Sequence, residues 1–118
     1  MKLWRLVLAV LVLAALAVLS FRTSSTSTMA TAPIPCTTSA LGEGFSTSMH
    51  LTSFQNFGCE GTWAYAWATI GTGEHAIGVT EVLSFNSKRN QWSIVSRLTY
   101  CKASILPSVI YRQGCFSN

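Results

Sequence analysis

The most continuous hydrophobic feature of the chain is an apolar run over residues 6–19, which follows Lys2 and Arg5 and precedes a Ser/Thr-rich stretch. Two cations before such a run are the layout of a secretory signal. A bilayer-spanning helix needs about 20 apolar residues, and residues 3–21 make only a marginal span. The Ala-x-Ala triplets that would mark cleavage lie inside the run or well downstream of it. We therefore expect residues 1–21 to be either a cleaved signal peptide or an uncleaved N-terminal signal anchor.

The pattern changes at residues 22–35, which are rich in Ser and Thr and contain Pro33 and Pro35. Such a segment cannot bury enough apolar surface to order itself, so it is predicted to be a flexible linker. Periodic hydrophobic positions begin after it. We expect residues 36–118 to form one small domain.

Three stretches of this domain place apolar residues as β-strands do. Residues 63–70 alternate aromatic side chains with alanine, residues 78–85 are β-branched and apolar, and residues 92–100 alternate large apolar and polar positions. Turn-forming residues occupy 71–73 and 86–90 between them. This order predicts an antiparallel meander.

Shorter elements are predicted on both sides of the meander. Threonine caps indicate a helix over about 38–41, ended by Gly42. Residues 45–57 fit a helix loosely, but their Ser/Thr content favours a further strand. A helix over about 107–112 is predicted near the C-terminus, with Gly114 as its stop. The predicted fold class is α+β: an antiparallel three- to four-stranded meander with short N- and C-terminal helices, held by disulfides.

Pairing the strands symmetrically about their turns determines which side chains share a face. The pairs expected on one face are Phe85 with Trp92, Leu83 with Ile94, Val79 with Leu98, Ala68 with Val79, and Ala64 with Leu83. Small alanines beside large aliphatic residues allow close approach, so we expect the helices to cover this alanine face. The opposite face, called the aromatic face below, carries Trp63, Tyr65, Trp67, Val82, Val95 and Arg97.

The four cysteines add covalent constraints to the domain. Cys36, Cys59, Cys101 and Cys115 all follow the leader, and no pair has the C-x2-C spacing of a zinc site. The meander places Cys59 and Cys101 about 25 Å apart, whereas a disulfide needs Cα atoms within about 7 Å. Two connectivities remain. The shorter loops favour Cys36 to Cys59 with Cys101 to Cys115, and the rival joins Cys59 to Cys115 and Cys36 to Cys101.

Composition argues against nucleic acid and against catalysis. The chain carries a net charge of +4, but residues 36–118 hold five Lys/Arg against four Glu, which is +1. Nucleic-acid binding needs Lys and Arg clustered on one face. The domain has no Asp and only two isolated His. We therefore expect no nucleic-acid partner, no catalytic residue, no cofactor and no metal site.

Glu81 is the one acidic residue that the register directs into an apolar face, near Ala66 and opposite Ser96. A buried carboxylate must be paired, or its pKa rises. We expect it to find a backbone amide or a cation, or to meet Arg97 if the register slips by one residue. A functional acid is the alternative.

The aromatic face offers the best candidate binding surface. Trp63, Tyr65 and Trp67 form a stripe with Arg97 alongside, and rigid rings beside a cation can stack on sugars, nucleobases or apolar side chains. In the structural alternative, residues 45–57 fold over the stripe as a second layer. A bare aromatic patch of this size is rare on a monomer, which favours that alternative.

Several short motifs stand out between residues 57 and 118. They are Cys59 with Gly61, Trp63-Ala64-Tyr65-Ala66, residues 79–83 and 92–97, Cys101, Leu106-Pro107, Tyr111 and Gly114-Cys115-Phe116. A Cys-Trp-Ala opening, a short meander and a Leu-Pro helix that closes on a last Cys resemble small exported proteins of high-GC Gram-positive bacteria. That family is uncharacterised, so the resemblance implies an exported bacterial protein and assigns no catalytic residue.

These features predict a secreted or otherwise extracytoplasmic protein without enzymatic activity, acting as a binding or interaction module in the cell envelope or the medium. The expected partner is an envelope polymer or an extracellular protein. A membrane would be met only through residues 3–21, if the leader is retained. The alternatives are a secreted hydrolase inhibitor that uses a loop such as 86–90, or a small hydrolase.

Overall fold

The structure, a computed structural model, describes residues 32–116, so the predicted leader and most of the predicted linker lie outside the described residues. From Ile34 onward, the described residues belong to one compact unit. Two hydrophobic clusters and both disulfides form within this unit. It therefore contains the core and the cross-links that it needs to fold on its own.

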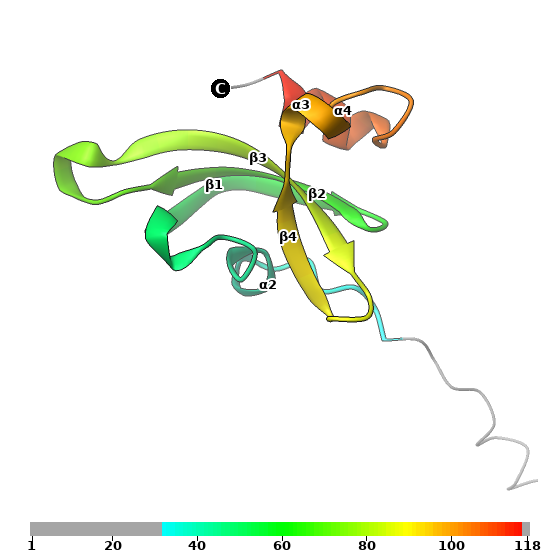
Figure 1. Cartoon of the computed structure of the whole chain (residues 1–118), viewed down its shortest axis with the longest axis horizontal. Coiled ribbons are helices and arrows are strands. Elements are labelled where there is room, and N and C mark those ends of the chain that lie inside the picture. Colours follow the sequence, from blue (N-terminus) through cyan, green and yellow to red (C-terminus); the bar gives the residue numbers. More distant parts are fainter. Residues whose placement is uncertain (1–31, 117–118) are drawn as a thin grey trace, which may run out of the picture. The chain divides into compact units, whose positions relative to one another are not determined.

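Four antiparallel strands form one sheet in the order β1-β2-β3-β4 (Figure 1). The strands are β1 (Leu51–Glu60), β2 (Trp63–Ile70), β3 (Ile77–Asn86) and β4 (Gln91–Val95). The predicted meander is confirmed. The further strand predicted over residues 45–57 is present as β1, but it begins only at Leu51 and continues to Glu60, and Thr47–Met49 form a 3-10 turn before it. The pairs Ala64 with Leu83, Ala68 with Val79, Leu83 with Ile94 and Phe85 with Trp92 are confirmed as well.

Short helices stand at both ends of the sheet-forming segment. They are α2 (Thr38–Gly42), α3 (Arg97–Tyr100) and α4 (Ser108–Cys115), and two 3-10 turns lie at Thr47–Met49 and Gly73–His75. The predicted cap of the first helix is present, because the Thr37 hydroxyl accepts a hydrogen bond from the Ala40 amide at 3.1 Å.

The helices cover both faces of the sheet, not the alanine face alone. Figure 1 shows α2 on one side of the strands and α3 with α4 on the other. The alanine-side core consists of Leu41, Phe45, Ala64, Ala66, Ala68, Leu83 and Trp92. The core on the aromatic face consists of Tyr65, Val82, Leu106 and Ile110. Each terminal segment of the domain therefore buries one face.

Two irregularities in β1 explain the ambiguous pattern of its sequence. Its register with β2 shifts between Leu51 and Ser53 and again between Phe54 and Asn56. A bulge places an extra residue in one strand and turns the next side chain to the other face. Leu51, Phe54 and Phe57 therefore all contact the alanine-side core although they are three residues apart.

The fourth strand ends at Val95, well before the predicted end at residue 100, and the predicted pair of Val79 with Leu98 is wrong. The chain turns out of the sheet into α3 instead. The Arg97 guanidinium donates to the Thr80 carbonyl at 3.3 Å, and the ring of Tyr100 packs on Trp63 with centroids 5.6 Å apart. These contacts lead the chain toward the aromatic face.

Residues 97–116, called the C-terminal cap below, comprise α3, the following loop and α4. Gly114 lies inside α4, so the prediction that it stops the helix is wrong. A Cβ atom at Gly114 would lie 2.7 Å from Val82 Cγ2 and 3.3 Å from Tyr65 Cβ. Only a hydrogen atom fits where α4 meets the sheet.

The disulfides join Cys36 to Cys59 and Cys101 to Cys115, with Cα separations of 6.1 and 5.6 Å. This is the connectivity that loop length favoured. The first bond ties the segment before α2 to the end of β1, and the second ties the start of the cap loop to α4.

We expect Gly114→Ala to lower the free energy of unfolding. Overpacking a filled core costs about 1–3 kcal/mol, and the neighbours of the new methyl group, Val82 and Tyr65, are both buried. Alanine recovers at most about 1 kcal/mol of helix propensity. Gly78→Ala is the control, because its added Cβ meets nothing within 4 Å. Urea unfolding of the oxidised proteins measures both changes, and a Gly114→Ala variant as stable as the parent would contradict the close approach.

A non-reducing peptide map is expected to recover the two disulfides described above. Replacing both Cys101 and Cys115 by Ala removes a cross-link with a sequence separation of 14 residues. The loss of stability should be about 3 kcal/mol, measured by thermal or urea unfolding. A peptide joining Cys59 to Cys101 or to Cys115 would contradict the fold.

Candidate functional site

The predicted binding stripe is packed beneath the C-terminal cap. Tyr65 is 7% exposed and belongs to the core formed with α4. The Trp67 indole N–H donates to the Gln113 carbonyl at 2.8 Å, and Trp63 packs on Tyr100. The three rings share one face, as the register predicted. The segment that covers them is the cap, whereas the expectation that residues 45–57 would do so is wrong.

The outer side of the cap is where exposed apolar side chains gather. Among the described residues, four large hydrophobic side chains are exposed: Ile77, Leu98, Ile105 and Phe116. Three of them belong to the cap, with exposed fractions of 96% for Leu98, 41% for Ile105 and 70% for Phe116. Single exposed apolar residues are ordinary, but three in one segment of 20 residues make the cap the candidate interaction surface of the described domain.

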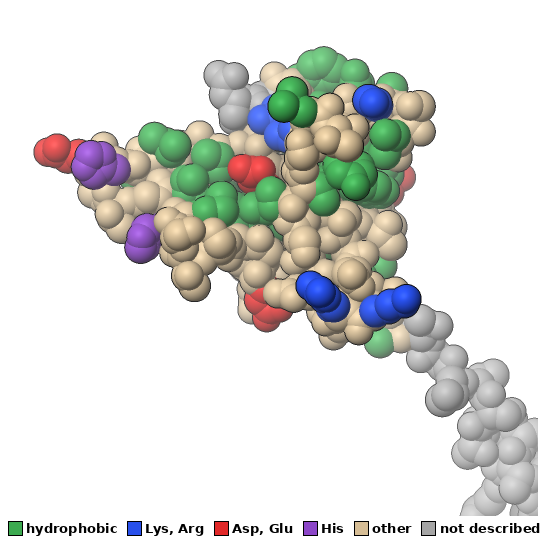
Figure 2. All heavy atoms as spheres, viewed as in Figure 1, with side chains coloured by type: hydrophobic (Ala, Val, Ile, Leu, Met, Phe, Trp, Pro, Cys, Tyr) green, Lys and Arg blue, Asp and Glu red, His purple; other side chains and the backbone are tan. Residues whose placement is uncertain are grey.

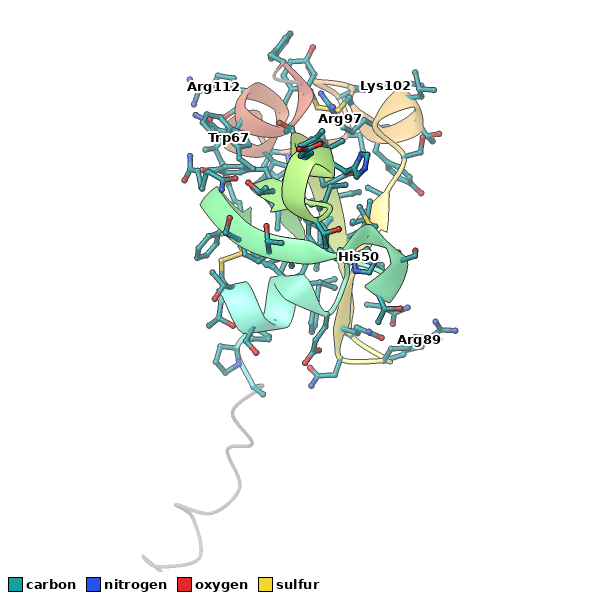
Figure 3. All side chains as sticks on the ribbon, turned by 90° about the vertical axis from the view of Figure 1, so that its left-hand side faces the viewer. His50, Trp67, Arg89, Arg97, Lys102 and Arg112 are labelled. Atoms are coloured by element: carbon teal, nitrogen blue, oxygen red, sulfur yellow. A yellow bond between two sulfur atoms is a disulfide. The ribbon has the colours of Figure 1, made fainter. Side chains whose placement is uncertain are left out.

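Basic side chains accompany these apolar ones. Lys102 and Arg112 are exposed, Arg97 is half-buried, and residues 97–116 contain no acidic residue. Figure 3 shows Arg97, Lys102 and Arg112 at the same end of the domain, with Arg89 at the opposite end. Figure 2 shows hydrophobic and basic side chains together at the α3 and α4 end. The cap therefore presents a surface that is both apolar and cationic.

The cap loop between α3 and α4 has a defined conformation. The amides of Ile105 and Leu106 both donate to the Lys102 carbonyl, at 2.9 and 3.1 Å. Leu106 is buried against the sheet, and the disulfide at Cys101 closes the loop onto α4. Ile105 is thus turned outward by a loop that is held at both ends.

Sequence reasoning missed Leu98, Lys102, Ile105, Arg112 and Phe116 as candidate site residues. Leu98 was assigned to the alanine face because it continues the alternation of β4. The signal that could have identified the cap was the absence of Asp and Glu after residue 81, together with apolar positions that fit no strand.

Glu81 of β3 pairs with Ala66 of β2, close to it as predicted. The predicted position opposite Ser96 is wrong, because β4 ends at Val95. Burial raises the pKa of its carboxyl group, and the nearby Arg97 charge opposes that rise. Arg97 reaches this region without a register slip, because the chain leaves β4 after Val95. The electrostatic effect of Arg97 on Glu81 is therefore exerted from the start of α3, not from β4.

A second surface feature of the described domain lies near α2. A shallow, mainly polar hollow of ≈ 210 Å³ is lined by Pro35, Thr37, Ser39, Ala40, Glu43, Asn90, Gln91 and Trp92. Within residues 32–116, His, Cys, Asp and Glu side chains form no group of three that could hold a metal ion. The same stretch includes no helix that is long and apolar enough to cross a membrane.

Comparisons with known proteins return no matching protein family, no matching curated protein and no matching solved structure. The candidate site is therefore defined by its own geometry.

We expect the stability of the domain to fall as pH rises through the titration of Glu81. Because its pKa is raised above the ordinary value of 4.5 in the folded state, the folded protein binds the proton more tightly than the unfolded chain does. Stability is then highest below the unfolded pKa and declines up to the folded pKa. Glu81→Gln should remove this decline and be at least as stable as the parent at neutral pH.

Urea unfolding at a series of pH values measures the effect, and Glu74→Gln, at an exposed position, controls for the loss of one negative charge. A Glu81→Gln variant that is less stable than the parent at neutral pH would mean that attraction to Arg97 outweighs the cost of burial.

Proposed function

We propose that the protein is an exported, non-enzymatic binding module of the cell envelope, and that it contacts its partner through the outer side of the C-terminal cap. The observation that carries this proposal is the exposure of Leu98, Ile105 and Phe116 in the same segment as the exposed Lys102 and Arg112. Folding does not require these side chains to be apolar, because the core beneath the cap is filled by other residues.

The export part of the proposal is supported by the two disulfides, which fit an extracytoplasmic protein. The leader pattern of residues 1–21 and the resemblance to exported proteins of high-GC Gram-positive bacteria point the same way. A domain built to persist outside the cytoplasm with an exposed apolar and cationic cap is suited to contacting envelope material.

A secreted hydrolase inhibitor is the second candidate. The turn over residues 86–90 is exposed and ordered, because the Asn86 side-chain oxygen accepts from the amides of Lys88 and Arg89 at 3.0 and 3.2 Å. Neither disulfide brackets this turn. It therefore lacks the covalent support expected of an inhibitory loop.

Co-sedimentation with cell-envelope fragments of a high-GC Gram-positive bacterium tests the proposal. The oxidised domain, residues 34–118, is expected to pellet with the fragments. Leu98→Gln should weaken this binding about tenfold or more, because burying a leucine side chain contributes about 1.5–3 kcal/mol. The matched control is Ile77→Gln, an exposed apolar position on β3 outside the cap.

A domain that stays in the supernatant would overturn the proposal. Inhibition of a secreted protease or glycosidase that is lost in Lys88→Gln and Arg89→Gln variants, but kept in Leu98→Gln, would favour the inhibitor instead.

A further inference from the structure

We infer that the C-terminal cap docks on the surface of membranes that contain anionic phospholipids. This inference rests on the proposed function and names its partner. The observations are those of the cap itself: Leu98, Ile105 and Phe116 are exposed, Lys102 and Arg112 of the same segment are exposed at the same end of the domain (Figure 3), and residues 97–116 contain no acidic side chain.

The mixture of side chains favours lipid over an anionic wall polymer. A polymer with charged phosphates or carboxylates would attract Lys102 and Arg112, but it offers little apolar surface against which leucine, isoleucine and phenylalanine side chains could be buried. Apolar and cationic side chains both contribute to binding at a bilayer surface, because binding there combines burial of apolar side chains with attraction to anionic headgroups.

Charge also argues against a second copy of the chain as the occupant. A symmetric dimer formed through the cap would bring Lys102 and Arg112 of one copy toward those of the other. Like charges across an interface disfavour association. The same cations complement an anionic lipid surface.

Contacts within the cap indicate how it would dock. Leu98, Ile105 and Phe116 would enter the boundary between headgroups and acyl chains, to a depth of about 5–10 Å. Lys102 and Arg112 can lay their aliphatic stems along that boundary and keep their charges at the phosphates. The rings of Tyr111 and Phe116 meet edge to face at 5.0 Å, and tyrosine prefers this interfacial layer.

Preorganisation of the cap lowers the cost of docking. Leu106 and Ile110 hold the cap on the sheet from beneath, and the hydrogen bonds to the Lys102 carbonyl fix the loop that carries Ile105. Few backbone torsions then need to be ordered when the surface is engaged.

The membrane is within reach if the predicted leader is retained. Fourteen residues, 22–35, separate the leader from the domain, and a chain of that length can span up to about 50 Å. The test below uses residues 34–118, so that any binding belongs to the domain.

Vesicle co-sedimentation tests the inference directly. The oxidised domain is mixed with phosphatidylcholine vesicles prepared with or without phosphatidylglycerol, at low and at high salt. We expect binding to the phosphatidylglycerol vesicles that weakens as salt is raised, and much weaker binding to phosphatidylcholine alone.

Matched variants separate the cap from the rest of the surface. Leu98→Gln and Phe116→Gln should each weaken binding about tenfold, and Lys102→Gln and Arg112→Gln about fivefold each. The controls are Ile77→Gln for an exposed apolar side chain, and Lys88→Gln with Arg89→Gln for cations of the β3–β4 turn. All of these positions are exposed, and unfolding midpoints equal to that of the parent show that each variant is folded.

Three outcomes would overturn the inference. The domain does not bind phosphatidylglycerol vesicles, the control variants weaken binding as much as the cap variants do, or binding to soluble poly(glycerol phosphate) is as strong and is unaffected by Leu98→Gln. If the domain still pellets with envelope fragments after their lipid has been extracted, the proposed function stands and only the lipid assignment fails.

Discussion

The sheet has two faces to bury and only two short terminal segments with which to cover them. Each face is covered by one segment, and each segment is held by one disulfide: Cys36 to Cys59 on the α2 side and Cys101 to Cys115 in the cap. Small residues where these segments meet the sheet allow close packing, so each short segment is enough to bury its face. Alanines of β2 receive the α2 segment, and Gly114 lets α4 approach Tyr65 and Val82. The core of so small a domain contributes only a small free energy of unfolding, so both disulfides are important for stability.

Because each face of the sheet is covered by one terminal segment, the side chains of the sheet faces are largely buried and unavailable for binding. The aromatic rings of β2 pack beneath the C-terminal cap, and the Trp67 indole N–H donates a hydrogen bond to the backbone of α4. The binding surface that we propose is therefore the outer side of the cap. Its inner side is filled by Leu106 and Ile110, so the apolar character of Leu98, Ile105 and Phe116 is not a requirement of packing. This exposed apolar surface is the basis of the binding role that we propose.

The elements whose bounds depend on local sequence could be predicted, whereas those whose bounds depend on tertiary contacts could not. β2 follows from the alternation of aromatic residues with alanine, β3 from its β-branched and apolar residues, and the turns between the strands from turn-forming residues. The same meander reduces the possible disulfide connectivities from three to two. β1 was ambiguous because its bulges space apolar residues by three. β4 was extended too far because nothing local reveals that Arg97 bonds to Thr80 or that Tyr100 packs on Trp63. Gly114 was assigned to a helix end because its close approach to Val82 is a property of the packed layers.

Arg97 illustrates how the candidate site differs from its prediction. As part of the aromatic stripe it was expected to accompany a bound ligand. Its guanidinium instead donates a hydrogen bond to the Thr80 carbonyl, and its charge opposes the rise that burial causes in the pKa of Glu81. Leu98, which is 96% exposed, follows it directly in the chain. Arg97 therefore ties the first residue of α3 to the backbone of β3, at the start of the segment that carries the candidate surface.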